Sequence, residues 1–140
     1  MTRPTLRAPA LAVVAVGGAV GALLRWGLSE AFPDPAAGFP WTTFAVNVTG
    51  AFLLALLPAS GLVRRRPLLP PLLGSGLLGG FTTLSTYSDQ ARALVAAGRP
   101  GLAATYAVGT LAVCLLVVAV ADRFSTVAQR LQLADEGGDE

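Results

Sequence analysis

Lysine and histidine are absent from this sequence, and cysteine occurs once. A single Cys excludes an internal disulfide framework. Without His, one Cys leaves no ligand set for zinc, haem or an iron–sulfur cluster, so chemistry of that kind is not expected. Charge is also scarce, since 13% of the 140 residues are charged while 54% are hydrophobic. The chain is therefore far more apolar than a soluble domain of this size and belongs in a lipid bilayer.

Four charge-poor runs divide the chain, and they cover residues 8–24, 35–63, 67–88 and 100–121. Each can cross a bilayer, the first provided that Arg25 lies near an interface or is paired within the bundle. We therefore predict an all-α membrane protein with four transmembrane helices in one domain, residues 1–125, and a disordered cytoplasmic tail, residues 126–140. A signal peptide is the alternative for the first run, but its poor cleavage site and the three later spans favour a membrane helix.

The loops differ in positive charge. If the four spans alternate in direction, seven Arg lie on one side and three lie on or near the other. The first group is Arg3, Arg7, Arg64, Arg65, Arg66, Arg123 and Arg130, and the second is Arg25, Arg92 and Arg99. The positive-inside rule then places both termini in the cytoplasm. Residues 64–66 give the strongest such signal, and a patch that binds anionic membrane lipid is the less favoured interpretation of them.

Polar residues in the second run recur at helical spacing. Thr43, Asn47 and Gly50 share one helix face. Because an Asn in hydrocarbon needs a partner, Asn47 faces either another helix or a watery path. The spacing leaves both an interhelical hydrogen bond and a role in a pore open.

The fourth run carries a second stripe, which consists of Tyr106, Thr110 and Cys114. Taken alone, such a stripe indicates helix packing more often than function, and Cys114 is interpreted as a small buried hydrophobic residue rather than a redox site. Close helix approach also explains two glycine pairs, which are Gly17 with Gly21 and Gly76 with Gly80.

The third run is less easily explained by packing. Its segment “GLLGGFTTLSTYSDQ” places two adjacent glycines and six hydroxyl side chains inside an apolar stretch. Gly-Gly followed by Thr-Thr favours a helix break near Gly79–Thr83, which would free backbone groups within the membrane. A buried cation held by carbonyls, or water in a pore, would satisfy those groups. The hydroxyl donors, with no acidic residue before Asp89, suit an anion.

Three of these segments together resemble the Fluc (CrcB-type) fluoride channel family. The segments are “GGAVGALLRW”, “TFAVNVTGAF” and “GLLGGFTTLSTYS”, in this order within four short spans. The resemblance implies a dimer of two four-helix subunits in antiparallel orientation, with two narrow fluoride pores and a structural sodium ion on the two-fold axis. The expected function is passive export of fluoride from the cytoplasm, which lowers its toxicity.

The resemblance also assigns roles to single residues. Sodium would be held by the backbone carbonyls of Gly79 and Thr82, and Arg25 would lie near a vestibule. The residues that it places along the fluoride pathway are Asn47, Leu84, Ser85, Tyr87, Tyr106 and Thr110. Family members usually read “TTFSTF” where this chain reads “TTLSTY”, so Leu84 and Tyr87 stand at the positions of two pore-lining phenylalanines.

Other classes of protein receive less support. Paired carboxylates, a nucleophile with its base and a phosphate-binding loop are all missing, so an enzyme is not expected. A small multidrug exporter would need an acidic residue in the first span, and residues 8–24 contain none. A non-conducting or structural membrane subunit remains the alternative, because the phenylalanine positions are altered. The expected partners are fluoride, membrane lipid and a second subunit, with no nucleic acid.

The identity of the second subunit has two possibilities. An antiparallel homodimer needs one chain to insert in both directions, whereas the uneven Arg distribution favours a single orientation. We therefore predict a heterodimer with an oppositely oriented homologue, and the homodimer stays open as the alternative.

Overall fold

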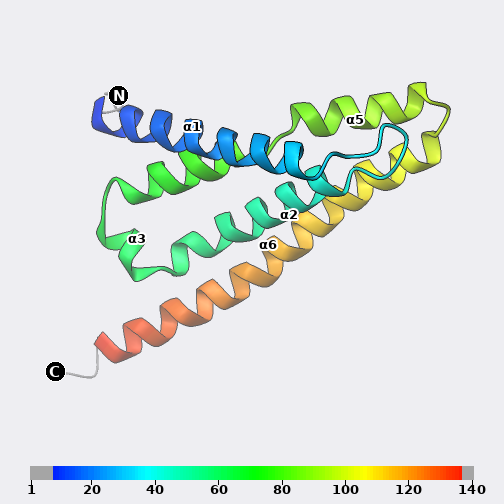
Figure 1. The fold of residues 1–140 in the computed structure, drawn as a ribbon. Helices are drawn as coiled ribbons and strands as arrows, with labels where there is room; N and C mark the ends of the chain where they lie inside the picture. Colours follow the sequence, from blue (N-terminus) through cyan, green and yellow to red (C-terminus); the bar gives the residue numbers. More distant parts are fainter. Residues whose placement is uncertain (1–7, 137–140) are drawn as a thin grey trace, which may run out of the picture.

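The computed structural model describes the backbone of residues 8–136 and the side chains of residues 8–125. All regular structure in this part of the chain is helical (Figure 1). The elements are α1 (Ala8–Ala31), α2 (Trp41–Leu56), η1 (Leu57–Ala59), α3 (Gly61–Arg65), η2 (Pro71–Leu78), α4 (Gly79–Phe81), α5 (Ser85–Ala96) and α6 (Pro100–Glu136). The predicted all-α class is confirmed for the described residues.

Three of the helical stretches are long and apolar enough to cross a membrane, and they cover Ala8–Ala31, Trp41–Ala59 and Pro100–Ser125. The predicted third span is not one continuous helix. It consists of η2, a single π-helix of eight residues, then the short α4, an interruption, and α5. A fourth crossing by this interrupted segment stays a prediction.

The last helix runs further than the sequence indicated. Residue 121 was the expected end of the apolar run, yet the backbone of α6 remains helical to Glu136. The side chains of residues 126–136 and the whole of residues 137–140 lie outside the described part. The disordered cytoplasmic tail over residues 126–140 therefore stays a prediction.

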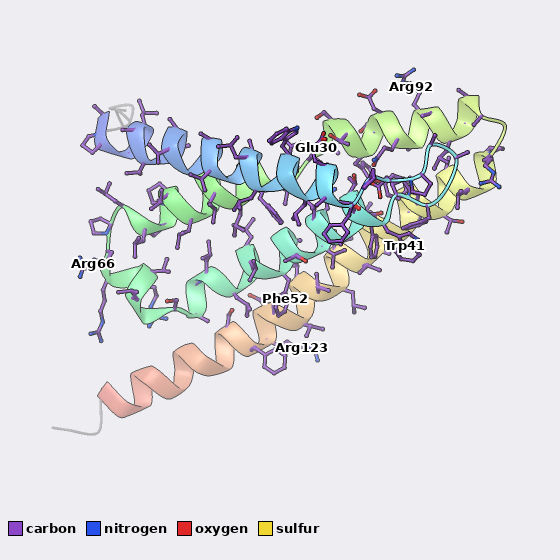
Figure 2. The ribbon with its side chains drawn as sticks, viewed as in Figure 1. Glu30, Trp41, Phe52, Arg66, Arg92 and Arg123 are labelled. Atoms are coloured by element: carbon purple, nitrogen blue, oxygen red, sulfur yellow. The ribbon has the colours of Figure 1, made fainter. Side chains whose placement is uncertain are left out.

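Successive long segments run in opposite directions along the bundle. The start of α1, the short α3 and the end of α6 lie at one end of the bundle, and the α1–α2 loop and the α5–α6 turn lie at the other (Figure 1). Figure 2 accordingly shows Arg66 and Arg92 near opposite ends. At the α5–α6 turn, Gly98 has a φ of 72°, a left-handed conformation that glycine adopts without strain. This arrangement agrees with spans that alternate in direction.

The tightest packing joins α1 to η2 and α4. A Cβ atom added at Gly21 would overlap the carbonyl oxygen of Leu77, and one at Gly80 would overlap the carbonyl oxygen of Gly18. A Cβ atom added at Gly17 would lie 3.1 Å from the Cα of Gly76 across the same contact. The prediction that both glycine pairs allow close helix approach is confirmed.

The buried core lies at the opposite end, between α5 and α6. Leu94, Ala103 and Tyr106 are its buried members, and Phe39 and Phe44 pack against them with other apolar side chains. Phe39 meets Tyr106 edge to face, with ring centroids 5.4 Å apart. This cluster anchors the loop before α2 to the last two helices.

Candidate functional site

The third apolar run is interrupted near its middle. Helix α4 ends at Phe81, Thr82 takes an extended backbone with a ψ of 157°, and α5 begins at Ser85. The amide of Thr82 still makes the helical hydrogen bond to the carbonyl of Leu78 at 3.0 Å, and its hydroxyl donates to the same carbonyl at 3.0 Å. The break predicted near Gly79–Thr83 is therefore present, with the non-helical residues at 82–84.

Asn47 of α2 bridges this interruption. Its Nδ2 donates to the carbonyl of Thr83 at 3.0 Å, and the amide of Thr83 donates to its Oδ1 at 2.8 Å. The side chain thus replaces both backbone partners that Thr83 loses at the break. The interhelical hydrogen bond that the sequence left open is present. One Nδ2 hydrogen remains beyond the bond to Thr83, since an amide nitrogen carries two.

The hydroxyl of Thr83 starts the next helix. It accepts from the amide of Thr86 at 3.1 Å, as an N-capping side chain does. It also lies 3.3 Å from the hydroxyl of Ser85 and 3.1 Å from that of Thr86. Ser85 is therefore part of the cap of α5.

An open groove of about 530 Å³ lies beside the break. Four of the residues predicted for the fluoride pathway line it, namely Asn47, Leu84, Tyr87 and Thr110. Gly79 and Thr82, predicted as sodium ligands, line it as well, and so does Cys114. Ser85 and Tyr106 are not among its lining residues. The structure thus gathers most of the predicted site residues on one surface.

The two altered phenylalanine positions differ from each other. The side chain of Leu84 is 76% exposed at the groove. Tyr87 is half-buried, and its hydroxyl donates to the carbonyl of Ala107 in α6 at 2.6 Å. Tyr87 therefore ties α5 to α6 with the hydroxyl that a phenylalanine would lack.

Two residues of the α6 stripe lie in contrasting surroundings. Thr110 is 3% exposed and lines the groove, yet its hydroxyl has no hydrogen-bond partner among the described residues. Tyr106, one turn earlier, is completely buried in the core, and its hydroxyl donates to Oε1 of Gln90 at 2.9 Å. The interpretation of the stripe as helix packing thus fits Tyr106, while Thr110 faces the groove.

Backbone carbonyls are left free at the break. The carbonyl oxygens of Gly79 and Thr82 accept no hydrogen bond from residues 8–125. The next carbonyl after that of Gly79, which belongs to Gly80, accepts from Nε of the half-buried Arg25 at 3.3 Å. Oxygen ligands of this kind fit a hard cation, and the chain's described part holds no cluster of His, Cys, Asp or Glu that would bind one instead.

The sequence did not indicate the roles of Asp34 and Gln90, whose side chains join α2, α5 and α6 by hydrogen bonds. Asp34 accepts from the amide of Thr42 at 2.8 Å, and thus caps α2 from a loop eight residues upstream. Gln90 joins this carboxylate to Tyr106. The usual capping signal lies within three residues of the helix start, so the sequence offered no cue for a cap from this distance.

Comparison with known proteins assigns the chain to a family. The profile of the CrcB-like proteins (Camphor Resistance, CrcB) matches residues 12–121. A protein of Streptomyces coelicolor named “Fluoride-specific ion channel FluC 1” is 44% identical over 120 residues, which is 80% of this chain and 74% of the relative. The FluC 1 protein of Mycobacterium bovis is 48% identical over 115 residues, covering 79% and 86% of the two chains.

A further relative covers almost the whole chain. It is “Fluoride-specific ion channel FluC 3” of Streptomyces avermitilis, 40% identical over 146 aligned positions, which cover 97% of this chain and 69% of the relative. The family profile begins before the glycine contact of α1 and continues through the helix break into α6. The chain therefore belongs to the CrcB-like protein family.

Proposed function

We propose that this protein is a subunit of a fluoride-selective channel that lets fluoride leave the cytoplasm passively. Family membership and the names of three relatives support this function. The observation that carries it is the groove beside the helix break, where the Asn47 amide and the Thr110 hydroxyl lie among apolar side chains. A small, strongly hydrated anion needs such donors in place of its water.

The charges of the groove agree with an anion pathway. Its lining residues include no carboxylate, which would repel fluoride, and no Lys or Arg, which would hold it too tightly. They also include no His or acid for proton coupling, so a passive channel is favoured over an ion-driven carrier. The pathway residues that we propose from this surface are Asn47, Leu84, Tyr87 and Thr110. Ser85 and Tyr106 remain proposed pathway residues, although they do not line the groove.

We further propose that the groove is completed by a second subunit in antiparallel orientation. The groove is open on one side, and the exposed Leu84 and Leu111 face outward there. The free carbonyls of Gly79 and Thr82 lie on the same surface, so two subunits would supply four oxygens to one sodium ion. When bound, sodium would be coordinated by these carbonyl oxygens, which the membrane leaves without other partners.

Charge supports our proposal for the orientation and the partner. With four crossings, the Arg distribution favours cytoplasmic termini and one direction of insertion. A heterodimer with an inverted homologue fits this bias, and the number in the name FluC 3 agrees with several copies in one organism. Within such a pair, the homologue would supply the phenylalanines that Leu84 and Tyr87 replace.

The experiment is ion efflux from proteoliposomes. The purified chain is reconstituted in vesicles loaded with fluoride or chloride, first alone and then with a homologue from the same organism. We expect fluoride to leave far faster than chloride, and the rate to rise when the homologue is present. Equal efflux of both anions would contradict selectivity. Full fluoride efflux from the chain alone, with tags showing both orientations, would contradict the heterodimer.

A further inference from the structure

A chain of hydrogen bonds crosses the end of the bundle away from the glycine contact. In the α1–α2 loop, the Asp34 carboxylate accepts from the amide of Thr42 at 2.8 Å and from the amide and hydroxyl of Thr43 at 3.3 and 3.2 Å. It also accepts from Nε2 of Gln90 in α5 at 3.1 Å. Oε1 of Gln90 then accepts from the Tyr106 hydroxyl of α6 at 2.9 Å. The carboxylate of the α1–α2 loop thereby links α2 to α5 and, through Gln90, to α6.

The carboxylate determines the direction of every bond in this chain. An ionised carboxylate can only accept, so Gln90 must turn its NH₂ group toward Asp34. Its carbonyl oxygen then faces Tyr106, and the phenol must donate to it. Because Tyr106 is completely buried, its hydroxyl hydrogen has no competing acceptor in water. The charge of Asp34 thus decides, through the two hydrogen bonds of Gln90, whether the Tyr106 hydroxyl donates or accepts.

The same bonds hold the start of α2. Thr43, which Asp34 binds, lies one helical turn before Asn47, which binds the break at Thr83. Helix α2 is therefore fastened at two successive turns of one face, first to the α1–α2 loop and α5, then to the interrupted segment. The position of Asn47 depends on both attachments.

We propose that Asp34 is a positioning residue, which sets the direction of hydrogen bonding at Tyr106 and clamps α2 so that Asn47 meets Thr83. Replacing Asp34 by Asn keeps the shape, and the remaining oxygen keeps the shorter bond from the Thr42 amide at 2.8 Å. The new NH₂ group then stands where Oδ2 accepted from Gln90, so that two donors face each other. Gln90 then reverses, its NH₂ group faces the phenol, and Tyr106 becomes an acceptor. The exchange Asp34→Asn with Gln90→Glu moves the carboxylate next to Tyr106 and makes the phenol a donor again.

The test is vibrational spectroscopy of Tyr106, because the intensity ratio of the tyrosine doublet in Raman spectra differs between donating and accepting phenols. The chain has two Tyr, so Tyr87→Phe leaves Tyr106 as the only reporter. In that background we expect a donor signature for the parent, an acceptor signature for Asp34→Asn, and a donor signature for the double exchange. Asp89→Asn is the matched control, since Asp89 contacts Arg92 on the surface and should leave the signature unchanged.

Each outcome decides the proposal. An unchanged signature in Asp34→Asn, or no recovery in the double exchange, would overturn it. If Asp34→Asn fails to fold, a folded double exchange with a donor signature supports the proposal, and a double exchange that also fails to fold overturns it.

Fluoride efflux adds a second readout, which rests on the proposed function. In proteins that keep Tyr87, we expect efflux to fall in Asp34→Asn and to recover in the double exchange. Efflux that stays at the parent level in Asp34→Asn would overturn the clamp on Asn47. Absence of efflux in the parent itself would contradict the proposed function, while the Raman signatures would still test Asp34.

Discussion

The two polar regions of this protein contain similar side chains but differ in how well their hydrogen bonds are satisfied. Around Asp34, Gln90 and Tyr106, the polar side chains have partners inside the chain. Beside the helix break, the Thr110 hydroxyl and the carbonyls of Gly79 and Thr82 have no donor or acceptor within the described residues. Buried polar groups such as the Thr110 hydroxyl are rarely left without partners. The hydrogen bonds of the first region are therefore complete within the described residues, whereas those of the second region are not.

The largest expected effect is a difference in stability between substitutions at two neighbouring glycines, Gly79 and Gly80. Gly80→Ala places a methyl group against the backbone of Gly18, so we expect it to destabilise the subunit by more than about 3 kcal/mol, beyond ordinary overpacking. At Gly79 the nearest atom to a new Cβ is 3.7 Å away and the residue is exposed. Gly79→Ala should therefore leave the subunit folded.

Subunit assembly tests the exposed surface at Gly79. If the surface at Gly79 meets a second subunit, Gly79→Val should reduce dimer yield and fluoride efflux more than Thr86→Val, with little loss of helical signal. Thermal unfolding followed by circular dichroism, together with size-exclusion chromatography, measures both effects. A fully assembled and active Gly79→Val protein would show that this surface is not an interface.

The second-largest expected effect concerns Asn47, whose side chain bridges the helix break. Asn47→Asp removes the Nδ2 donor and places a carboxylate beside the carbonyl of Thr83, so we expect a loss of about 1–3 kcal/mol in unfolding free energy. The negative charge should also suppress fluoride efflux strongly. Thr49→Val, on an exposed position of the same helix, is the control. Undiminished efflux in Asn47→Asp would remove Asn47 from the pathway.

Much of this arrangement could be predicted from the sequence, because it depends on local composition. The apolar runs predicted four membrane helices, of which three are present as long apolar helices, and the Gly-Gly and Thr-Thr pairs predicted the break. The glycine spacing predicted close helix approach, but not that α1 would pack on η2. The need of Asn47 for a partner in hydrocarbon left an interhelical hydrogen bond and a pore role open, and the structure shows the hydrogen bond, with Thr83 as its partner.

What the sequence did not predict depends on tertiary packing. Asp34 and Gln90 are 56 positions apart, and only the fold brings them together. Tyr106 and Thr110 share a helix face by spacing, yet α5 covers the first turns of α6 and leaves the later ones to the groove. The π-helical form of η2 was also not expected, since its apolar pattern resembles that of an ordinary helix.

The smallest expected effect on stability compares the unpartnered hydroxyl beside the helix break with a satisfied hydroxyl elsewhere on α6. Thr110→Val removes a buried hydroxyl that has no partner, so we expect unfolding free energy to stay constant or rise by up to about 1 kcal/mol. Ser125→Ala removes a buried hydroxyl that donates to the carbonyl of Ala55 at 3.0 Å, and should cost about 1 kcal/mol. Fluoride efflux should show the reverse order, with a clear loss in Thr110→Val and none in Ser125→Ala. A loss of stability in Thr110→Val with normal efflux would mean that its hydroxyl serves the fold, and the distinction between the two regions would then fail at α6.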